Sequence, residues 1–102
     1  DESMTSKTRV TPQELRKKAD ELENLNTTFL TQVSGLRDDE AKLGASYKGD
    51  AQTQFHIRFT NDLEKFEAFS NAIRRYIEQL RADADSYDAA ESRNVAIAQT
   101  NR

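Results

Sequence analysis

A repeat of large apolar residues at every seventh position is the feature that most restricts the fold of this chain. Its members are Leu15, Leu22, Phe29, Leu36 and Leu43. A seven-residue spacing is typical of an α-helix that buries one narrow stripe against another helix. Weaker positions lie between the members of the repeat: Ala19, Leu25 or Asn26, and Val33. The repeat predicts a long amphipathic helix over residues 11–43.

A second stretch of regular apolar spacing follows the first. Its apolar residues recur every three or four positions, as on one face of a helix. They are Ala51, Phe55, Phe59, Leu63, Phe66, Phe69 (or Ser70), Ile73, Ile77, Leu80, Ala84 and Tyr87. Neither proline nor glycine occurs from Ala51 to Arg102, so no helix breaker interrupts this pattern. We expect this helix to span residues 50–91.

Two glycines close together separate the predicted helices. Gly44 and Gly49 predict a turn over residues 44–49, with Gly44 as the residue that follows the first helix. Asp50 then suits the start of the second helix, because an acidic side chain there complements the helix dipole.

The start of the first helix has its own signal. Thr11 is suited to be the N-cap, Pro12 to be the first helical residue and Glu14 to be the capping-box acid. No apolar repeat continues into residues 1–10 or 92–102, so we expect both segments to be flexible.

Two long helices joined by a short turn should pack antiparallel. A lone pair leaves much of its large apolar surface in water, and burial of each such side chain contributes about 1.5–3 kcal/mol. We therefore predict an all-α fold, an antiparallel two-helix hairpin that dimerises into a four-helix bundle. The residues expected to form the core and dimer seam are Leu15, Leu22, Phe29, Leu36, Leu43, Phe55, Phe59, Leu63, Phe66, Ile73, Ile77 and Leu80.

Composition argues against several classes of function. The net charge of -3 comes without a basic stripe, which argues against nucleic acid as a partner. No apolar run approaches the roughly 18 residues of a membrane span, and no apolar segment near the start suggests a cleavable signal peptide. The absence of cysteine excludes disulfides and thiolate metal ligands. We expect the native chain to begin at Met4.

The sequence offers no catalytic constellation. His56 is the single histidine, and no orienting acid or pocket can be assigned to it from the sequence. Acidic residues are dispersed rather than grouped with it at ligand spacing. We interpret His56 as a surface or boundary residue, and we expect no enzyme activity, cofactor or metal.

Two tyrosines invite a functional explanation beside a structural one. Tyr47 lies in the turn between two glycines, where it either covers the end of the hairpin or serves recognition. Tyr87 and Glu91 are four residues apart and share one side of a helix where the apolar repeat fades. They are either an ordinary helix-end pair or a recognition motif.

The chain resembles the WXG family of early secretory antigenic target-like proteins, the small substrates of type VII secretion. Tyr47-Lys48-Gly49, followed by Ala51 and Phe55, matches the family pattern Trp-x-Gly-x-Ala-x-x-x-Phe except at its first position. The segment from Tyr87 to Glu91 matches the family's Tyr-x-x-x-Asp/Glu export motif. The opening Val10-Thr11-Pro12-Gln13-Glu14-Leu15 also looks like the family's entry into its first helix. The resemblance covers residues 8–91.

This resemblance implies a function. Such proteins are exported folded, as dimers, across the membranes of Gram-positive bacteria, after recognition by an FtsK/SpoIIIE-type ATPase. The chain would then be a secreted effector or an escort for partner substrates, paired with itself or with a related family member. An antiparallel dimer would bring Tyr47 of one chain near Tyr87 and Glu91 of the other. The alternatives are a cytosolic helical adaptor that is not exported, and a small helical enzyme or metal carrier.

Overall fold

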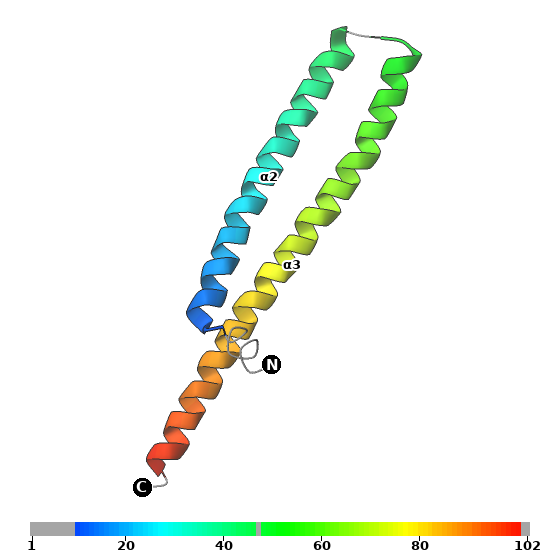
Figure 1. The fold of residues 1–102 in the computed structure, drawn as a ribbon. Helices are drawn as coiled ribbons and strands as arrows, with labels where there is room; N and C mark the ends of the chain where they lie inside the picture. Colours follow the sequence, from blue (N-terminus) through cyan, green and yellow to red (C-terminus); the bar gives the residue numbers. More distant parts are fainter. Residues whose placement is uncertain (1–9, 47, 101–102) are drawn as a thin grey trace, which may run out of the picture. The chain divides into compact units, whose positions relative to one another are not determined.

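The described structure consists of two long helices. A computed structural model describes residues 10–46 and 48–100 of the chain (Figure 1). Helix α2 spans Pro12–Ser46 and helix α3 spans Asp50–Thr100. All regular secondary structure of the described residues is helical, which confirms the all-α prediction.

The N-terminus of α2 is capped as the sequence indicates. The backbone N–H of Glu14 donates to Oγ1 of Thr11 at 3.1 Å, and that of Leu15 donates to the Thr11 carbonyl at 3.1 Å. Pro12, which has no N–H to donate, is the first helical residue. Thr11 is therefore the N-cap of α2.

The helix ends differ from those predicted. Helix α2 continues through Gly44 to Ser46, so Gly44 is not the residue after the helix. Its missing side chain leaves room for Gln52 of α3, because a Cβ on Gly44 would lie 3.0 Å from Nε2 of Gln52. Helix α3 begins at Asp50 but continues past Glu91 to Thr100. The prediction of a flexible N-terminal segment falls on residues 1–9, which lie outside the described residues.

The chain divides into two compact units, each of which pairs a part of α2 with a part of α3. Residues 23–74 form one, here called the hairpin unit, and residues 1–22 with 75–102 form the other, the terminal unit. The paired segments run antiparallel in both. In the terminal unit, Arg16 contacts Asp85 whereas Asp20, further along α2, contacts Arg81, earlier in α3.

The hairpin unit shows the same order of contacts. Phe29 lies beside Phe66, whereas Glu40, further along α2, contacts His56, which comes earlier in α3. Within this unit the helices form the predicted helical hairpin.

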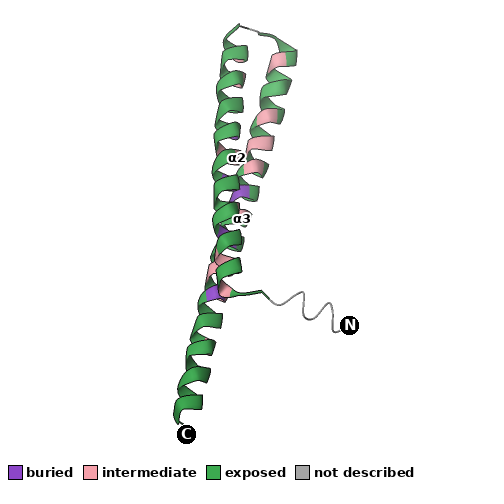
Figure 2. Ribbon diagram, turned by 60° about the vertical axis from the view of Figure 1, so that its left-hand side comes forward, coloured by how far each residue is buried: buried purple, intermediate pink, exposed green. Residues whose placement is uncertain are grey.

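The most deeply buried residues are mostly small. Figure 2 shows few buried positions on either helix. In the hairpin unit they are Asn26, Val33 and Ser70, and in the terminal unit Ala19, Ile77 and Ala84. Most of the large residues predicted for the seam are only half-buried, namely Leu15, Leu22, Phe29, Phe59, Leu63, Phe66, Ile73 and Leu80. Leu36, Leu43 and Phe55 are exposed. Apart from Ile77, the most deeply buried of the described residues are therefore small or medium-sized.

Two of the buried side chains carry polar atoms without a partner. Neither Oδ1 of Asn26 nor Oγ of Ser70 forms a hydrogen bond with any residue that the structure describes. A buried polar atom in this state costs about 1–3 kcal/mol. The hairpin unit thus carries two unfavourable atoms at its centre.

We predict that Ser70→Ala raises the free energy of unfolding by about 1 kcal/mol or more, because it removes a buried hydroxyl and adds a better helix former. Urea titration followed by circular dichroism at one fixed protein concentration measures the change. Ser34→Ala, at an exposed position of α2 in the same unit, reports the helix-propensity part alone. A Ser70→Ala variant no more stable than Ser34→Ala would contradict the prediction.

Candidate functional site: an apolar face and the end of α3

The central residues of the hairpin unit recur every seven positions on both helices. This central series is Asn26, Val33 and Glu40 on α2, with His56, Leu63 and Ser70 on α3. The residue three positions after each member is large and apolar, giving Phe29, Leu36, Leu43, Phe59, Phe66 and Ile73. The residue just before a member is also large and apolar at Leu25, Phe55 and Phe69. These nine residues are here called the apolar face.

The antiparallel arrangement places both parts of the apolar face on one side of the helix pair. Viewed from one end, residues advance around α3 in the opposite sense to α2, and α3 also faces in the opposite direction. Because the two reversals cancel, residues that lie the same number of positions after a central residue are on the same side of the helix pair, whether they belong to α2 or to α3. The ring contacts agree with this geometry. Phe29 meets Phe66 and Phe69 edge to face, with centroids 5.9 and 5.5 Å apart.

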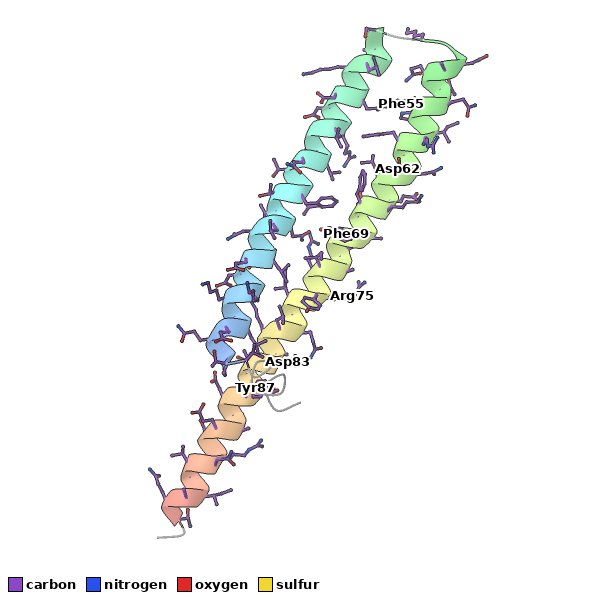
Figure 3. The ribbon with its side chains drawn as sticks, viewed as in Figure 1. Phe55, Asp62, Phe69, Arg75, Asp83 and Tyr87 are labelled. Carbon is purple, nitrogen blue, oxygen red and sulfur yellow. The ribbon has the colours of Figure 1, made fainter. Side chains whose placement is uncertain are left out.

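The other side of the hairpin unit is mainly polar. The residues four positions after each member of the central series are Leu30, Arg37, Gly44, Thr60, Glu67 and Arg74. The apolar face, in contrast, leaves Leu25, Leu36, Leu43, Phe55 and Phe69 exposed, two of which are labelled in Figure 3. A polar side and an apolar side of this extent are typical of a helix pair that meets another protein surface.

His56, which the sequence predicts to be a surface or boundary residue, has a partner that the sequence did not predict. Nδ1 of His56 lies 2.7 Å from Oε1 of Glu40, whose side chain is largely buried. Both belong to the central series, so a polar pair takes the place of an apolar contact near the turn. A shallow groove there is lined by Glu40, Ala41, Gly44, Gln52, Thr53 and His56. No group of three or more potential His, Asp or Glu metal ligands occurs among residues 10–46 and 48–100.

The predicted turn motif is only partly described. Tyr47 lies outside the described residues, and Lys48 is exposed. Gly49 has a φ of 132°, which side chains disfavour, and its carbonyl accepts the N–H of Thr53 at 3.1 Å to begin α3. Glycine is therefore required at position 49 by the backbone itself.

The predicted export motif lies on α3 in the terminal unit. Tyr87 is 54% exposed and Glu91 is also exposed. Tyr87 comes three positions after the buried Ala84, and Glu91 comes seven after it. In sequence spacing, Tyr87 therefore corresponds to the large apolar residues of α3, and Glu91 corresponds to the members of the central series. Beyond Ala90, every described residue of α3 is exposed.

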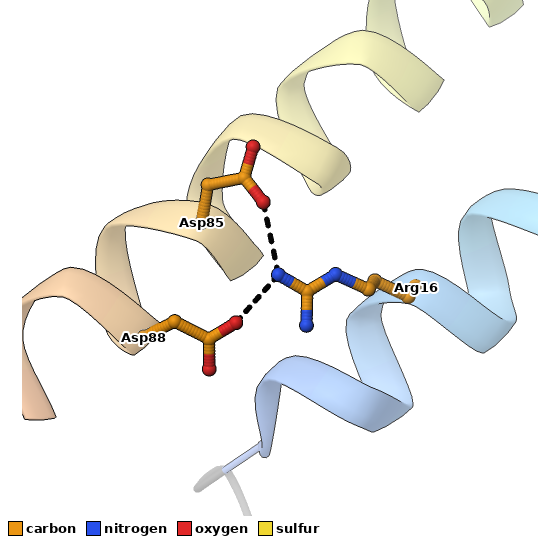
Figure 4. Close-up of polar contacts among 3 residues, drawn as sticks. All are labelled: Arg16, Asp85 and Asp88. Atoms are coloured by element: carbon orange, nitrogen blue, oxygen red, sulfur yellow. Dashed lines mark hydrogen bonds and ion pairs between the residues drawn. The ribbon is translucent and has the colours of Figure 1, made fainter. Parts of the chain in front are cut away.

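An arginine from α2 binds the turn of α3 that carries Tyr87. Nη2 of Arg16 lies 2.9 Å from Oδ1 of Asp85 and 2.6 Å from Oδ2 of Asp88 (Figure 4). The hydrogen bonds to Asp85 and then to Asp88 raise the pKa of Arg16 above its ordinary value, so it is charged at any physiological pH. Sequence analysis missed these contacts, although Arg16 and Asp88 lie four positions after Pro12 and the buried Ala84, which continue the seven-residue spacing of the central series.

The fold and these surfaces define a class of small α-helical proteins that act by association through an amphipathic helix pair. Within that class, the chain belongs to the WXG100 family, described as proteins of 100 residues with WXG, whose pattern matches residues 7–92. Neither the curated proteins nor the solved structures include a match to the chain.

Membership of this family confirms the predicted resemblance and the expectation that the chain is not an enzyme. The family consists of non-enzymatic secreted helical proteins and is typical of type VII secretion substrates, and its members typically form dimers. The chain is accordingly not an enzyme. Neither helix, as far as it is described, includes a stretch long and apolar enough to cross a membrane.

We predict opposite effects of alanine at two glycines. Gly49→Ala should lower the free energy of unfolding by about 1–3 kcal/mol, because a side chain strains the backbone at its positive φ. Gly35→Ala should raise it by about 1 kcal/mol, because Gly35 lies inside α2 with open space around it. Thermal unfolding followed by circular dichroism measures both. Equal effects of the two changes would show that position 49 does not need glycine.

Proposed function

We propose that this protein is exported by a type VII secretion system as a folded dimer, and acts outside the cell as an effector or as an escort for partner substrates. The observation that carries the proposal is the apolar face of the hairpin unit, with five large exposed residues beside a partly polar centre. Membership of the WXG100 family supports the route of export.

The apolar face is the proposed dimer surface. Two chains contribute ten exposed large side chains, and burying the exposed half of each supplies on the order of 10 kcal/mol. Association itself costs about 4–15 kcal/mol. The two terms are of similar size, so loss of one apolar side chain should shift the equilibrium. The partner is a second copy of the chain or a related family member.

The proposed signals for export are the turn and the Tyr87–Glu91 motif. We infer that Tyr47 replaces the tryptophan of the Trp-x-Gly motif for which the family is named, because Tyr47, Lys48 and Gly49 lie between the two helices in the sequence. Tyr87 and Glu91 are both exposed on α3, as residues read by an FtsK/SpoIIIE-type ATPase have to be. No cofactor, nucleic acid or membrane insertion is part of this function.

We predict that Leu36→Ser weakens dimerisation, whereas Ile57→Ser leaves it unchanged. Both are aliphatic and about half exposed, at 47% and 50%, but Ile57 lies one position after His56 and so away from the apolar face. Size-exclusion chromatography with light scattering should show a dimer that dissociates at least about tenfold more readily for Leu36→Ser, the loss of about 1.4 kcal/mol. Phe69→Ser should act in the same direction.

A monomeric wild-type chain at high micromolar concentration would exclude the homodimer. Mixing with a related family member then decides between a heterodimer through the same face and no dimer at all. A heterodimer sensitive to Leu36→Ser but not to Ile57→Ser would support the proposed surface. Equal effects of the two substitutions would contradict it.

We predict that Tyr87→Ala and Glu91→Gln each reduce extracellular accumulation severalfold in a host that carries the secretion system, without reducing the cellular level of the protein. The matched controls are Tyr76→Ala and Glu78→Gln. Tyr76 is 59% exposed, Glu78 is exposed, and both lie on α3 in the same unit. Export that is independent of Tyr87 and Glu91 would favour the alternative of a cytosolic adaptor with an accidental motif.

A further inference from the structure

Arg16 joins two carboxylates of α3 through a single nitrogen. Nη2 lies within hydrogen-bond distance of both Asp85 and Asp88, which are one helical turn apart (Figure 4). Charge-assisted hydrogen bonds of this kind are shorter and more directional than neutral ones. The contact therefore fixes one particular turn of α3 against the first turns of α2.

That turn of α3 contains Tyr87. Asp85 and Asp88 flank it in sequence, and Glu91 follows Asp88 by less than one turn. Ala90 is the last described residue of α3 that is half-buried. The Arg16 contacts thus lie at the end of the paired part of α3, beyond which the described residues of the helix are all exposed and local opening is easiest. A residue that restrains this turn determines how Tyr87 and Glu91 are presented.

We propose that Arg16 is a positioning residue for the Tyr87–Glu91 export motif: it binds Asp85 and Asp88 and so holds the motif as an ordered helical surface. The proposal rests on the proposed export function and adds a residue from α2 to its signal. Part of the signal is then available only when the N-terminal part of α2 is folded on α3.

The contribution of these ion pairs to global stability is small. The side chains of Arg16, Asp85 and Asp88 are 42%, 77% and 50% exposed, and ion pairs this exposed contribute little. We therefore expect them to act locally, on how well ordered the helical turn with the motif is. Local order can be measured separately from the overall stability of the protein.

A second ion pair of the terminal unit supplies the matched control. Nη2 of Arg81 lies 3.0 Å from Oδ1 of Asp20, and the side chain of Arg81 is also 42% exposed. This pair joins the same two helices but lies further from Glu91. Arginine and glutamine have similar helix propensities, so Arg16→Gln and Arg81→Gln remove the ion pairs with little change in helix propensity.

The experiment measures amide hydrogen exchange and export for the full-length protein. Arg16→Gln should speed exchange in residues 85–100 by about threefold or more and reduce export severalfold, while light scattering shows an unchanged oligomer. Arg81→Gln should leave both exchange in residues 85–100 and export close to those of the wild type. The charge exchange Arg16→Asp with Asp88→Arg should restore slow exchange and export together.

The outcomes separate this proposal from its rivals. Normal export of Arg16→Gln overturns it. Reduced export with unchanged exchange also overturns it, because Arg16 would then be contacted by the secretion machinery itself. If the charge exchange makes amide exchange slow again but does not restore export, order at this turn is not what export requires, and the proposal is likewise overturned.

The proposed function can fail independently. If Tyr87→Ala and Glu91→Gln are exported like the wild type, the motif has no export role and the assignment of Arg16 to export falls with it. Amide exchange alone then decides whether Arg16 orders the end of α3. If export is reduced in Tyr87→Ala and Glu91→Gln but is normal in Arg16→Gln, only the positioning role is wrong.

Discussion

The contact of α2 and α3 through small and polar central residues is the constraint on which the rest of the structure depends. Ala19, Asn26, Ser70 and Ala84 are buried in their units, and such side chains allow helix axes to approach closely. Apart from Ile77 and Leu63, most large side chains of the apolar pattern then lie beside this contact and not at its centre. Phenylalanines and leucines are displaced to one side of the pair, where the apolar face forms.

This arrangement couples folding to association. The buried apolar residues of the described chain are Ala19, Val33, Ile77 and Ala84, which is a small core for a chain of this length. Two buried polar atoms without partners reduce its stability further. In the proposed dimer, a protein with so little interior gains much of its stability from the partner that covers its apolar face, so its stability should depend on concentration.

The sequence was informative where the pattern was apolar and periodic. Two long helices follow from the seven-residue repeat and the lack of breakers, and Thr11 follows from capping chemistry. The centre of the contact was harder to find. Asn26 and Ser70 are polar, so a search for apolar residues omits them. Asn26 nevertheless lies seven residues before the buried Val33, and Ser70 lies seven residues before the buried Ile77.

Single interactions between distant residues were beyond the reach of the sequence. The pairing of Glu40 with His56, and of Arg16 with Asp85, depends on the register between α2 and α3, which no local pattern specifies. The C-terminal ends of both helices also differ from those predicted. Gly44 resembles a terminator, yet inside a helix it costs only about 1 kcal/mol, which the helix tolerates because Gln52 packs against it.

The polar residues at central positions differ in how the fold accommodates them, and that difference bears on function. Glu40 and His56 bind each other, and Asn26 and Ser70 are enclosed where no other protein can reach them. Glu91 also falls at a central position, but it is exposed, and no ion pair to it occurs among the described residues. The proposed recognition of the Tyr87–Glu91 motif supplies a reason for an acid at this position. Position 91 follows Ala90, the last half-buried residue described in α3, and an acid there leaves this part of the helix in solvent instead of extending the helix contact.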